Sequence, residues 1–132
     1  MNKDTREINP YSGAFILEQL QRFGSDMNRK HEVSFWLYFP NEFSAQQAAR
    51  RGESAELQAK VSPPPKNYNG SQWLCLLYCP HVPDESLLDG ISNFCMELAS
   101  EFGGKYDGWE ASLEIGEEKN PDLHALSFRG IS

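Results

Sequence analysis

The sequence contains few cysteines, no long apolar run and no excess of basic side chains. Its three cysteines, Cys75, Cys79 and Cys95, are an odd number at spacings that imply no disulfide framework. The longest strongly apolar run, residues 73–79, is far shorter than the roughly 20 residues that span a bilayer. Lysine and arginine total 12 against 19 acidic residues, for a net charge of −7. This composition excludes a disulfide-stapled protein, a membrane-spanning protein and the basic footprint of a DNA-binding protein.

Motifs of common enzymes are also missing. The patterns G-x-S-x-G, H-E-x-x-H, G-x-x-x-x-G-K-[ST] and a G-x-G-x-x-G between a strand and a helix do not occur. Cys75, Cys79 and His81 resemble three zinc ligands, but no second cluster offers a fourth, so we interpret the cysteines as buried, reduced thiols. The sequence therefore predicts a protein that is not an enzyme and that binds no metal or cofactor.

The length of 132 residues, with 39% hydrophobic residues, fits one globular domain. Residues 1–10 form a loose polar lead-in, residues 11–115 form the predicted domain, and residues 116–132, which lack clear periodicity, form a predicted C-terminal tail. Residues 1–7 alternate in charge and contain no apolar stretch typical of a secretion signal. We therefore expect a cytoplasmic protein that does not associate with membranes.

Hydrophobic periodicity predicts a helix followed by the order strand–helix–strand–strand–helix–strand. The helices fall at residues 11–23, 42–51 and 84–102, and the strands at residues 31–39, 54–61, 73–79 and 106–115. Asn41 and Asp84 are expected to cap their helices, Gly24 to close the first helix, and Phe43 to point inward. The first and third strands are apolar on both faces, as is typical of central strands, whereas the second and fourth alternate like edge strands.

Two βαβ units joined by a hairpin give an antiparallel sheet in the order 4-1-3-2. This order also makes the first and third strands central. We therefore predict an α+β fold, a ferredoxin-like βαββαβ sandwich with an extra N-terminal helix. Because the two crossover helices cover only one sheet face, the other face must be covered by the N-terminal helix, by a second copy of the chain in a homodimer, or by a partner.

The acidity is concentrated in one part of the chain. Residues 84–118 carry ten acidic side chains and a single lysine, Lys105, so this segment alone has a charge of −9. One interpretation is a solvated helix face and edge strand; the other is an acidic surface that docks a basic protein partner. The candidate binding residues on the long helix and last strand are Glu97, Glu101, Tyr106, Asp107, Glu110 and Glu114.

The dipeptide Asp107-Gly108 lies inside the last predicted strand and favours a bulge, because glycine tolerates a positive φ. Such a bulge would place Trp109 in the core. It leaves Tyr106 and Asp107 as the candidates for a surface role.

RNA-recognition modules use the same βαββαβ arrangement and stack bases on aromatic residues of the two central strands. Trp36, Tyr38, Trp73 and Tyr78 lie on those strands. However, the K/R-G-F/Y-G/A-F-V-x-F/Y motif is absent from residues 73–79 and the overall charge is acidic. Core packing explains these aromatic residues better, and a single-stranded RNA-binding module using Trp36 and Tyr38 is the alternative function.

Two short motifs and the element order resemble a known family. Gly24-Ser25-Asp26 after the first helix and Tyr106-Asp107-Gly108-Trp109 at the last strand are similar to motifs of the regulator of ribonuclease E activity B (RraB) family, and the resemblance covers residues 11–115. It implies a cytoplasmic, non-enzymatic bacterial protein with a ferredoxin-like fold that binds ribonuclease E and inhibits its endonucleolytic cleavage, which changes messenger RNA decay. Family members usually carry an acidic C-terminal tail, whereas residues 116–132 are nearly neutral here.

Overall fold

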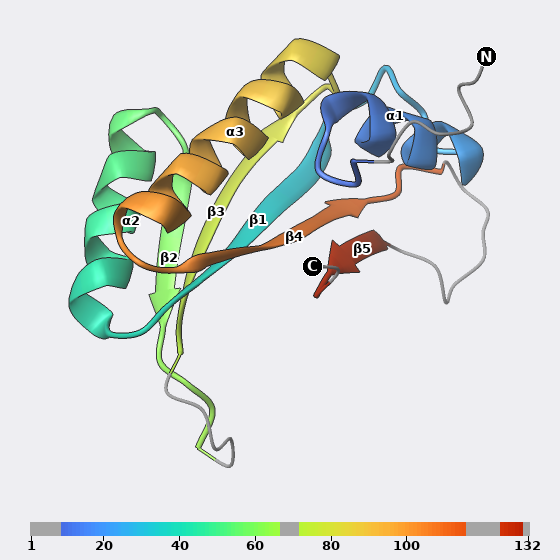
Figure 1. Cartoon of the computed structure of the whole chain (residues 1–132). Helices are drawn as coiled ribbons and strands as arrows, with labels where there is room; N and C mark the ends of the chain where they lie inside the picture. The colour runs from blue at the N-terminus through green and yellow to red at the C-terminus, as the bar shows by residue number, and fades with distance from the viewer. Residues whose placement is uncertain (1–8, 67–71, 116–124, 131–132) are drawn as a thin grey trace, which may run out of the picture.

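A computed structural model describes residues 9–66, 72–115 and 125–130 of the chain. This part of the chain contains three helices and five strands, which Figure 1 labels. They are α1 (Gly13–Arg22), β1 (His31–Phe39), α2 (Glu42–Ser54), β2 (Gln58–Ser62), β3 (Trp73–His81), α3 (Glu85–Glu101), β4 (Lys105–Ser112) and β5 (Ala125–Arg129). The predicted α+β class is confirmed, and the ferredoxin-like designation stays a prediction.

The five strands form one antiparallel sheet in the order β2-β3-β1-β4-β5. β1 and β3 lie inside the sheet and β2 lies at its edge, as the sequence predicts. The predicted order 4-1-3-2 is wrong for the sheet as a whole. β4, β1, β3 and β2 are neighbours in that order, but a fifth strand pairs with β4 and places β4 in the interior. The residues of β4 alternate between apolar and polar as in an edge strand, although β4 is an interior strand. This is possible because the helices of the described residues cover only one face of the antiparallel sheet, and the other face can carry polar side chains.

The fifth strand lies within the segment that the sequence assigns to an aperiodic tail. β5 pairs with β4 from Gly108↔Arg129 to Ser112↔Ala125. Phe128 of β5 stacks on Trp109 with ring centroids 5.0 Å apart, and this contact attaches the strand to the core. Residues 116–124 and 131–132 of the predicted tail, and residues 1–8 of the predicted lead-in, lie outside the described residues.

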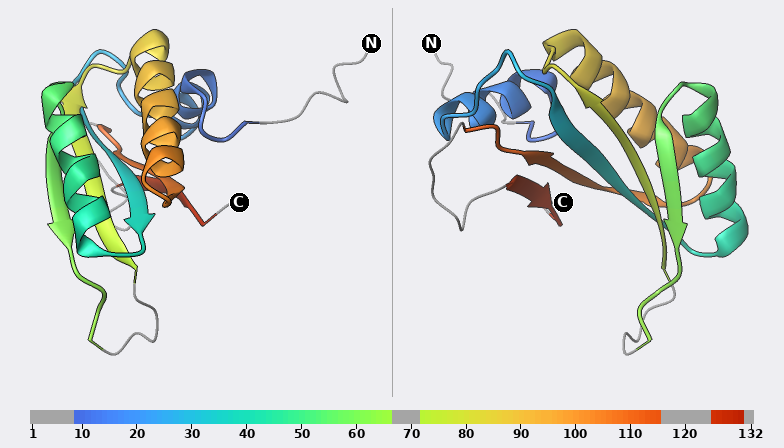
Figure 2. Two further views of the ribbon diagram at one scale, coloured as in Figure 1. Left: turned by 60° about the vertical axis from the view of Figure 1, so that its left-hand side comes forward. Right: turned by 180° about the vertical axis from the view of Figure 1, so that it is seen from behind.

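The helices form a layer on one face of the sheet, as the views in Figures 1 and 2 show. α2 contacts β2 and β3, α3 contacts β1 and β4, and α1 packs against α3. The core lies between the layers and includes Val33, Phe35, Leu37 and Phe39 of β1, which alternate with less buried residues. Burial of these apolar side chains is the main contribution to the stability of the fold.

Local signals set the ends of the helices. The side chains of Asn41 and Asp84 accept hydrogen bonds from the backbone N–H groups of Ser44 and Leu87, so both predicted caps are confirmed. α2 continues beyond its predicted end to Ser54, and β2 therefore begins only at Gln58.

Phe43 is 71% exposed, so its predicted inward position is wrong. The buried stripe of α2 consists of small residues, Ala45, Ala48, Ala49 and Gly52, and Phe43 lies off this stripe. A Cβ atom at Gly52 would lie 2.5 Å from Leu77 Cδ2, which shows how closely α2 approaches β3. Small side chains on this stripe permit the close packing.

Candidate functional site

The motif Gly24-Ser25-Asp26 forms a hydrogen-bonded junction between three elements. Gly24 follows α1 with a φ of +83°, a conformation that glycine adopts without strain, so its predicted role in closing the helix is confirmed. The buried Ser25 Oγ accepts a hydrogen bond from the N–H of Glu114 at 2.8 Å. The N–H of Asp26 donates to the carbonyl oxygen of Glu114 at 2.7 Å. The motif thus connects the end of α1 to the segment after β4.

His31 completes this network at the start of β1. Its Nδ1 lies 2.9 Å from the carbonyl oxygen of Arg29, which can only accept, so Nδ1 carries the hydrogen. Nε2 then accepts from the Ser25 hydroxyl at 2.6 Å. Because His31 is fully buried and both ring nitrogens have partners, the geometry indicates a structural role for this motif.

The motif Tyr106-Asp107-Gly108-Trp109 contains the predicted bulge. Trp36 pairs with Gly108 and the next residue, Leu37, pairs with Tyr106, so Asp107 is the extra residue of β4. One extra residue shifts the alternation of side chains, and this places Tyr106 and Trp109 on the same, helix-covered face. Trp109 is fully buried, as predicted, but Tyr106 is only 7% exposed and lies in the core, not on the surface where the sequence places it.

The two aromatic residues of this motif hold the segment before α1. Trp109 Nε1 donates to the carbonyl oxygen of Pro10 at 2.7 Å. The Tyr106 hydroxyl lies 3.3 Å from Ser92 Oγ, which donates to the carbonyl oxygen of Tyr11 at 2.6 Å. Burial raises the pKa of the Tyr106 phenol well above its ordinary value, so this group stays neutral. Both motifs therefore act inside the fold.

The acidic candidates do not share one surface. Glu97 and Glu101 are exposed on α3 in the helix layer, and Glu101 forms an ion pair with Arg51 at 2.8 Å. Glu110 pairs in register with Ser34, on the sheet face opposite the helices. The structure therefore separates the acids of the long helix from those of the last strand.

Of the other two acidic candidates, Asp107 lies within β4 and Glu114 lies two residues after it. Asp107 is half-buried at the bulge, and its backbone oxygen accepts from the N–H of Gly130 at 2.8 Å. Glu114 follows β4, and its carboxylate accepts from Ser112 Oγ at 2.8 Å. Neither residue joins the acidic helix surface.

The sheet face away from α2 and α3, named the open face here, carries aromatic and apolar side chains. No helix of the described ranges lies on it, as the rear view in Figure 2 shows. Its central residues are half-buried and come from β1 and β3: Ser34, Trp36, Tyr38, Leu74, Leu76 and Tyr78. Trp73 pairs with the buried Phe39 and therefore belongs to the other face.

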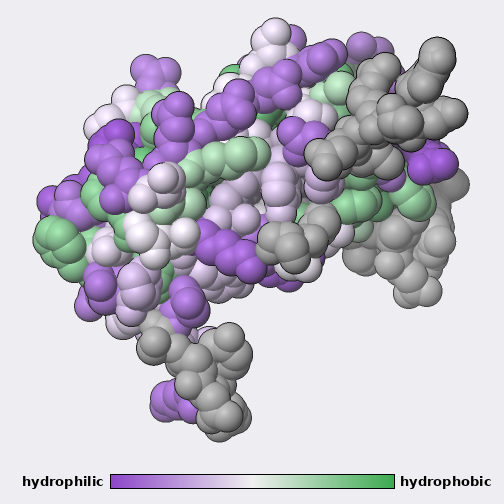
Figure 3. Space-filling model, in the orientation of Figure 1, coloured by the Kyte–Doolittle hydropathy of each residue, from purple (hydrophilic) through white to green (hydrophobic). Residues whose placement is uncertain are grey.

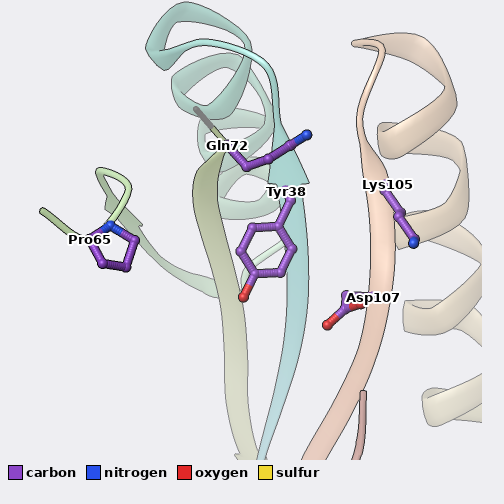
Figure 4. A pocket seen from close by; sticks show the side chains of 5 residues that line it. All are labelled: Tyr38, Pro65, Gln72, Lys105 and Asp107. Atoms are coloured by element: carbon purple, nitrogen blue, oxygen red, sulfur yellow. The ribbon is translucent and has the colours of Figure 1, made fainter. Parts of the chain in front are cut away.

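Arg129 of β5 covers part of the open face. Its guanidinium carbon lies 3.9 Å from the centroid of the Trp36 ring, which is cation–π geometry. Gly108 lies between the two residues in register and has no side chain, so Arg129 can reach across β4. A cavity of about 490 Å³ adjoins one end of this face. In Figure 4, Tyr38 stands between Pro65 on one side and Lys105 and Asp107 on the other.

A second cavity lies on the helix side of the molecule, and we call it the α3 groove. It has a volume of about 540 Å³ and is formed by the turn after α2, the end of β3 and the first half of α3. Its lining residues are mostly apolar: Ala55, Glu56, Leu57, Cys79, His81, Ser86, Leu87, Gly90, Ile91 and Phe94. Sequence patterns missed this groove because three separate segments form it; the available signal was a glycine inside a predicted helix.

The cysteines lack the surroundings of reactive or metal-bound thiols. Burial raises the pKa of Cys75 to about 12 and also raises that of Cys95, so both thiols stay protonated. Burial, and then the charge of Glu32, raises the pKa of Cys79. In the part of the chain that the structure describes, no group of three His, Cys, Asp or Glu side chains is placed to hold a metal ion.

Comparison with known proteins gives one family. The model of RraB, regulator of ribonuclease activity B, matches residues 13–111, from the start of α1 to the last part of β4. The matched range contains both motifs, Gly24-Ser25-Asp26 and Tyr106-Asp107-Gly108-Trp109. No curated protein matches the chain. Within the described ranges, none of the helices has the length and apolar character needed to cross a membrane.

Proposed function

The chain belongs to the family of regulators of ribonuclease activity B, and from this we propose that it is a non-enzymatic protein that binds ribonuclease E and inhibits its cleavage of RNA. The observation that carries the proposal is the family match over residues 13–111. The proposal includes action in the cytoplasm, an effect on messenger RNA decay, and a ferredoxin-like core formed by β1, α2, β2, β3, α3 and β4.

The structural role of the two sequence motifs is consistent with a protein that regulates its partner by binding. Ser25, Tyr106 and Trp109 form hydrogen bonds inside the fold, so these side chains maintain the shape of the protein. The α3 groove and the open face are two surfaces that offer apolar contact to a partner. A protein partner needs such contact and no reactive group.

A cleavage assay tests the proposal. The full chain is titrated into purified ribonuclease E and a labelled single-stranded RNA, and we expect the cleavage rate to fall as the chain is added. The same RNA with the chain alone is expected to stay intact. A cleavage rate that does not change at a large molar excess of the chain would overturn the proposal.

Capture of the enzyme at two salt concentrations tests the electrostatic part. The chain has a net charge of −7, and exposed charges interact less as salt increases because the Debye length shortens. We expect immobilised chain to capture purified ribonuclease E at low salt and to capture less at moderate salt. Equal capture at both concentrations would exclude electrostatic attraction as a major contribution.

One observation favours a second function, the binding of single-stranded RNA on the open face. Trp36 and Tyr78 lie there in the neighbourhood of Lys60 and Arg129, and aromatic residues beside cations can stack bases. This function predicts quenching of tryptophan fluorescence by single-stranded RNA at low salt, and loss of that quenching in Trp36→Phe. Unchanged emission of the natural chain would exclude it.

A further inference from the structure

Gly90 lies in the first half of α3 and lines the α3 groove. Glycine is the least favourable residue in a helix interior apart from proline, because it loses the most backbone freedom on folding. A Cβ atom placed at Gly90 would meet no atom within 4 Å apart from its two chain neighbours and the backbone of its own helix, and the residue is exposed. The fold therefore tolerates an unfavourable residue at a position where a side chain would fit.

Other glycines of the chain have an internal reason. A Cβ atom at Gly13 would lie 2.3 Å from the carbonyl oxygen of Glu85, and one at Gly104 would lie 2.4 Å from that of Tyr38. Gly24 and Gly103 have positive φ angles. Gly90 has neither a close contact nor a positive φ. Its missing side chain leaves space only on the outside of the helix, in the groove.

The groove has the size and the lining of a binding site. Its volume of about 540 Å³ lies within the roughly 300–1,000 Å³ of typical ligand pockets. Leu57 and Ile91 are buried in its wall, and Leu87 and Phe94 are half-buried. An apolar side chain that enters the groove would leave water and contact these residues.

The charges around the groove are of one sign. The segments that supply its lining residues, 53–57 and 79–97, contain no lysine or arginine. They contain six acidic residues, of which Glu56 lines the groove itself: Glu53, Glu56, Asp84, Glu85, Asp89 and Glu97. The nearby Arg51 is paired with Glu101. In Figure 3, which views the helix layer, hydrophilic residues follow α3 across the surface. Such a field attracts a basic partner and disfavours an acidic one.

We infer that the α3 groove binds a basic segment of a partner protein, with one apolar side chain of that segment inserted where Gly90 leaves space. The groove and its charge define the chemistry of the segment. The identity of the partner as ribonuclease E rests on the proposed function.

The test uses the full chain and two variants of Gly90. Gly90→Ala improves helix propensity, so its melting temperature should rise, while its methyl group narrows the groove and weakens binding. Gly90→Leu fills the groove, and we expect its affinity for purified ribonuclease E to fall by about tenfold or more, the loss expected when one buried anchor is excluded. Asn93→Ala is the matched control, because Asn93 is exposed on α3 and does not line the groove; it should leave binding unchanged.

A synthetic peptide separates this inference from the proposed function. The probe is a labelled peptide of lysines and arginines around one leucine, compared with the same peptide in which acids replace the basic residues. We expect the basic peptide to bind the natural chain and to bind Gly90→Leu more weakly. That result supports the groove even if ribonuclease E does not bind, in which case the proposed function fails alone. Equal binding of both probes to the natural chain and Gly90→Leu, or no binding of the basic peptide, would overturn the inference.

Discussion

The α3 groove and the open face both present apolar side chains, but they differ in charge. The segments that supply the groove lining, residues 53–57 and 79–97, contain six acidic residues and no lysine or arginine. Around the open face, Lys60, Lys105 and Arg129 balance Glu32, Asp107 and Glu110. Apolar contact alone therefore does not distinguish the two surfaces, whereas charge assigns a basic partner to the groove.

The two surfaces also use glycine in opposite ways. Gly108 is fully enclosed, because a Cβ atom there would lie 1.8 Å from the carbonyl oxygen of Phe128. It holds β5 against β4 and lets Arg129 reach Trp36. Gly90 has no close neighbour at its Cβ position, and the missing side chain leaves space in the groove. Gly108 thus allows two strands to pack closely, whereas Gly90 keeps the groove accessible to a partner.

The largest expected effect comes from Gly108→Ala. The new methyl group would collide with β5, and the residue would keep a φ of +132°, which a side chain rarely adopts. We expect a loss of about 3 kcal/mol in the free energy of unfolding, measured with urea. Gly103→Ala, at a φ of +73° with no atom near its Cβ position, should lose clearly less. Affinity of the folded Gly108→Ala variant for ribonuclease E should not change; a loss of affinity would contradict the separation of the two surfaces.

Ser25→Ala should have the next largest effect and should affect neither surface. It removes the acceptor for the N–H of Glu114 and the donor to His31 Nε2. Because both partners would lose a buried hydrogen bond, we expect about 2 kcal/mol less stability in urea unfolding. Ser100→Ala, at an exposed position of α3, is the control and should change stability little. A Ser25→Ala variant as stable as the natural chain would refute the structural role of this motif.

Charge reversal compares the two surfaces directly. Glu56→Lys combined with Glu97→Lys places cations beside the groove, and we expect affinity for ribonuclease E at low salt to fall about tenfold, or about 1.4 kcal/mol. Lys60→Glu combined with Lys105→Glu makes the matched change at the open face, and should alter affinity less. Both differences should shrink as salt increases. A larger loss of affinity in the open-face variant than in the groove variant would indicate that the open face, and not the α3 groove, binds ribonuclease E.

The smallest expected effect is a loss of stability at high pH, which arises on the helix-covered side of the sheet. Burial raises the pKa of Cys75 from 9.0 to about 12 and also raises that of Tyr106 from 10.0. The folded state thus favours the neutral thiol and phenol. The stability that comes from this preference is fully present below the unfolded thiol pKa of about 9 and is lost as the pH rises above it. From Cys75 alone we expect about 1 kcal/mol less stability at pH 10 than at pH 8. In Cys75→Ala this pH difference should be smaller; an equal difference would contradict the role of the thiol.

Local signals allowed much of the fold to be predicted. The caps Asn41 and Asp84, the closure at Gly24 and the bulge at Asp107 depend on residues near in sequence, and all of them occur in the structure. β5 was not predicted, because its pairing depends on contact between Phe128 and Trp109, which are distant in the sequence. The position of Tyr106 was wrong because the bulge shifts the alternation of side chains by one residue.

The candidate site was less predictable than the fold. Sequence placed the acids of the long helix and the last strand together, but α3 covers one face of the sheet and Glu110 lies on the other. The α3 groove forms only when the turn after α2, the end of β3 and α3 meet. Which face a strand residue occupies, and which segments meet, are properties of the assembled sheet.

Hydroxyl-radical footprinting of the chain, with and without ribonuclease E, shows which of the two surfaces the enzyme covers, because it reports the solvent exposure of individual side chains. Leu87 and Phe94 represent the α3 groove, and Trp36 and Tyr78 represent the open face. We expect ribonuclease E to protect Leu87 and Phe94 and to leave Trp36 and Tyr78 as reactive as in the free chain. Protection of Trp36 and Tyr78 with unchanged reactivity of Leu87 and Phe94 would contradict this expectation.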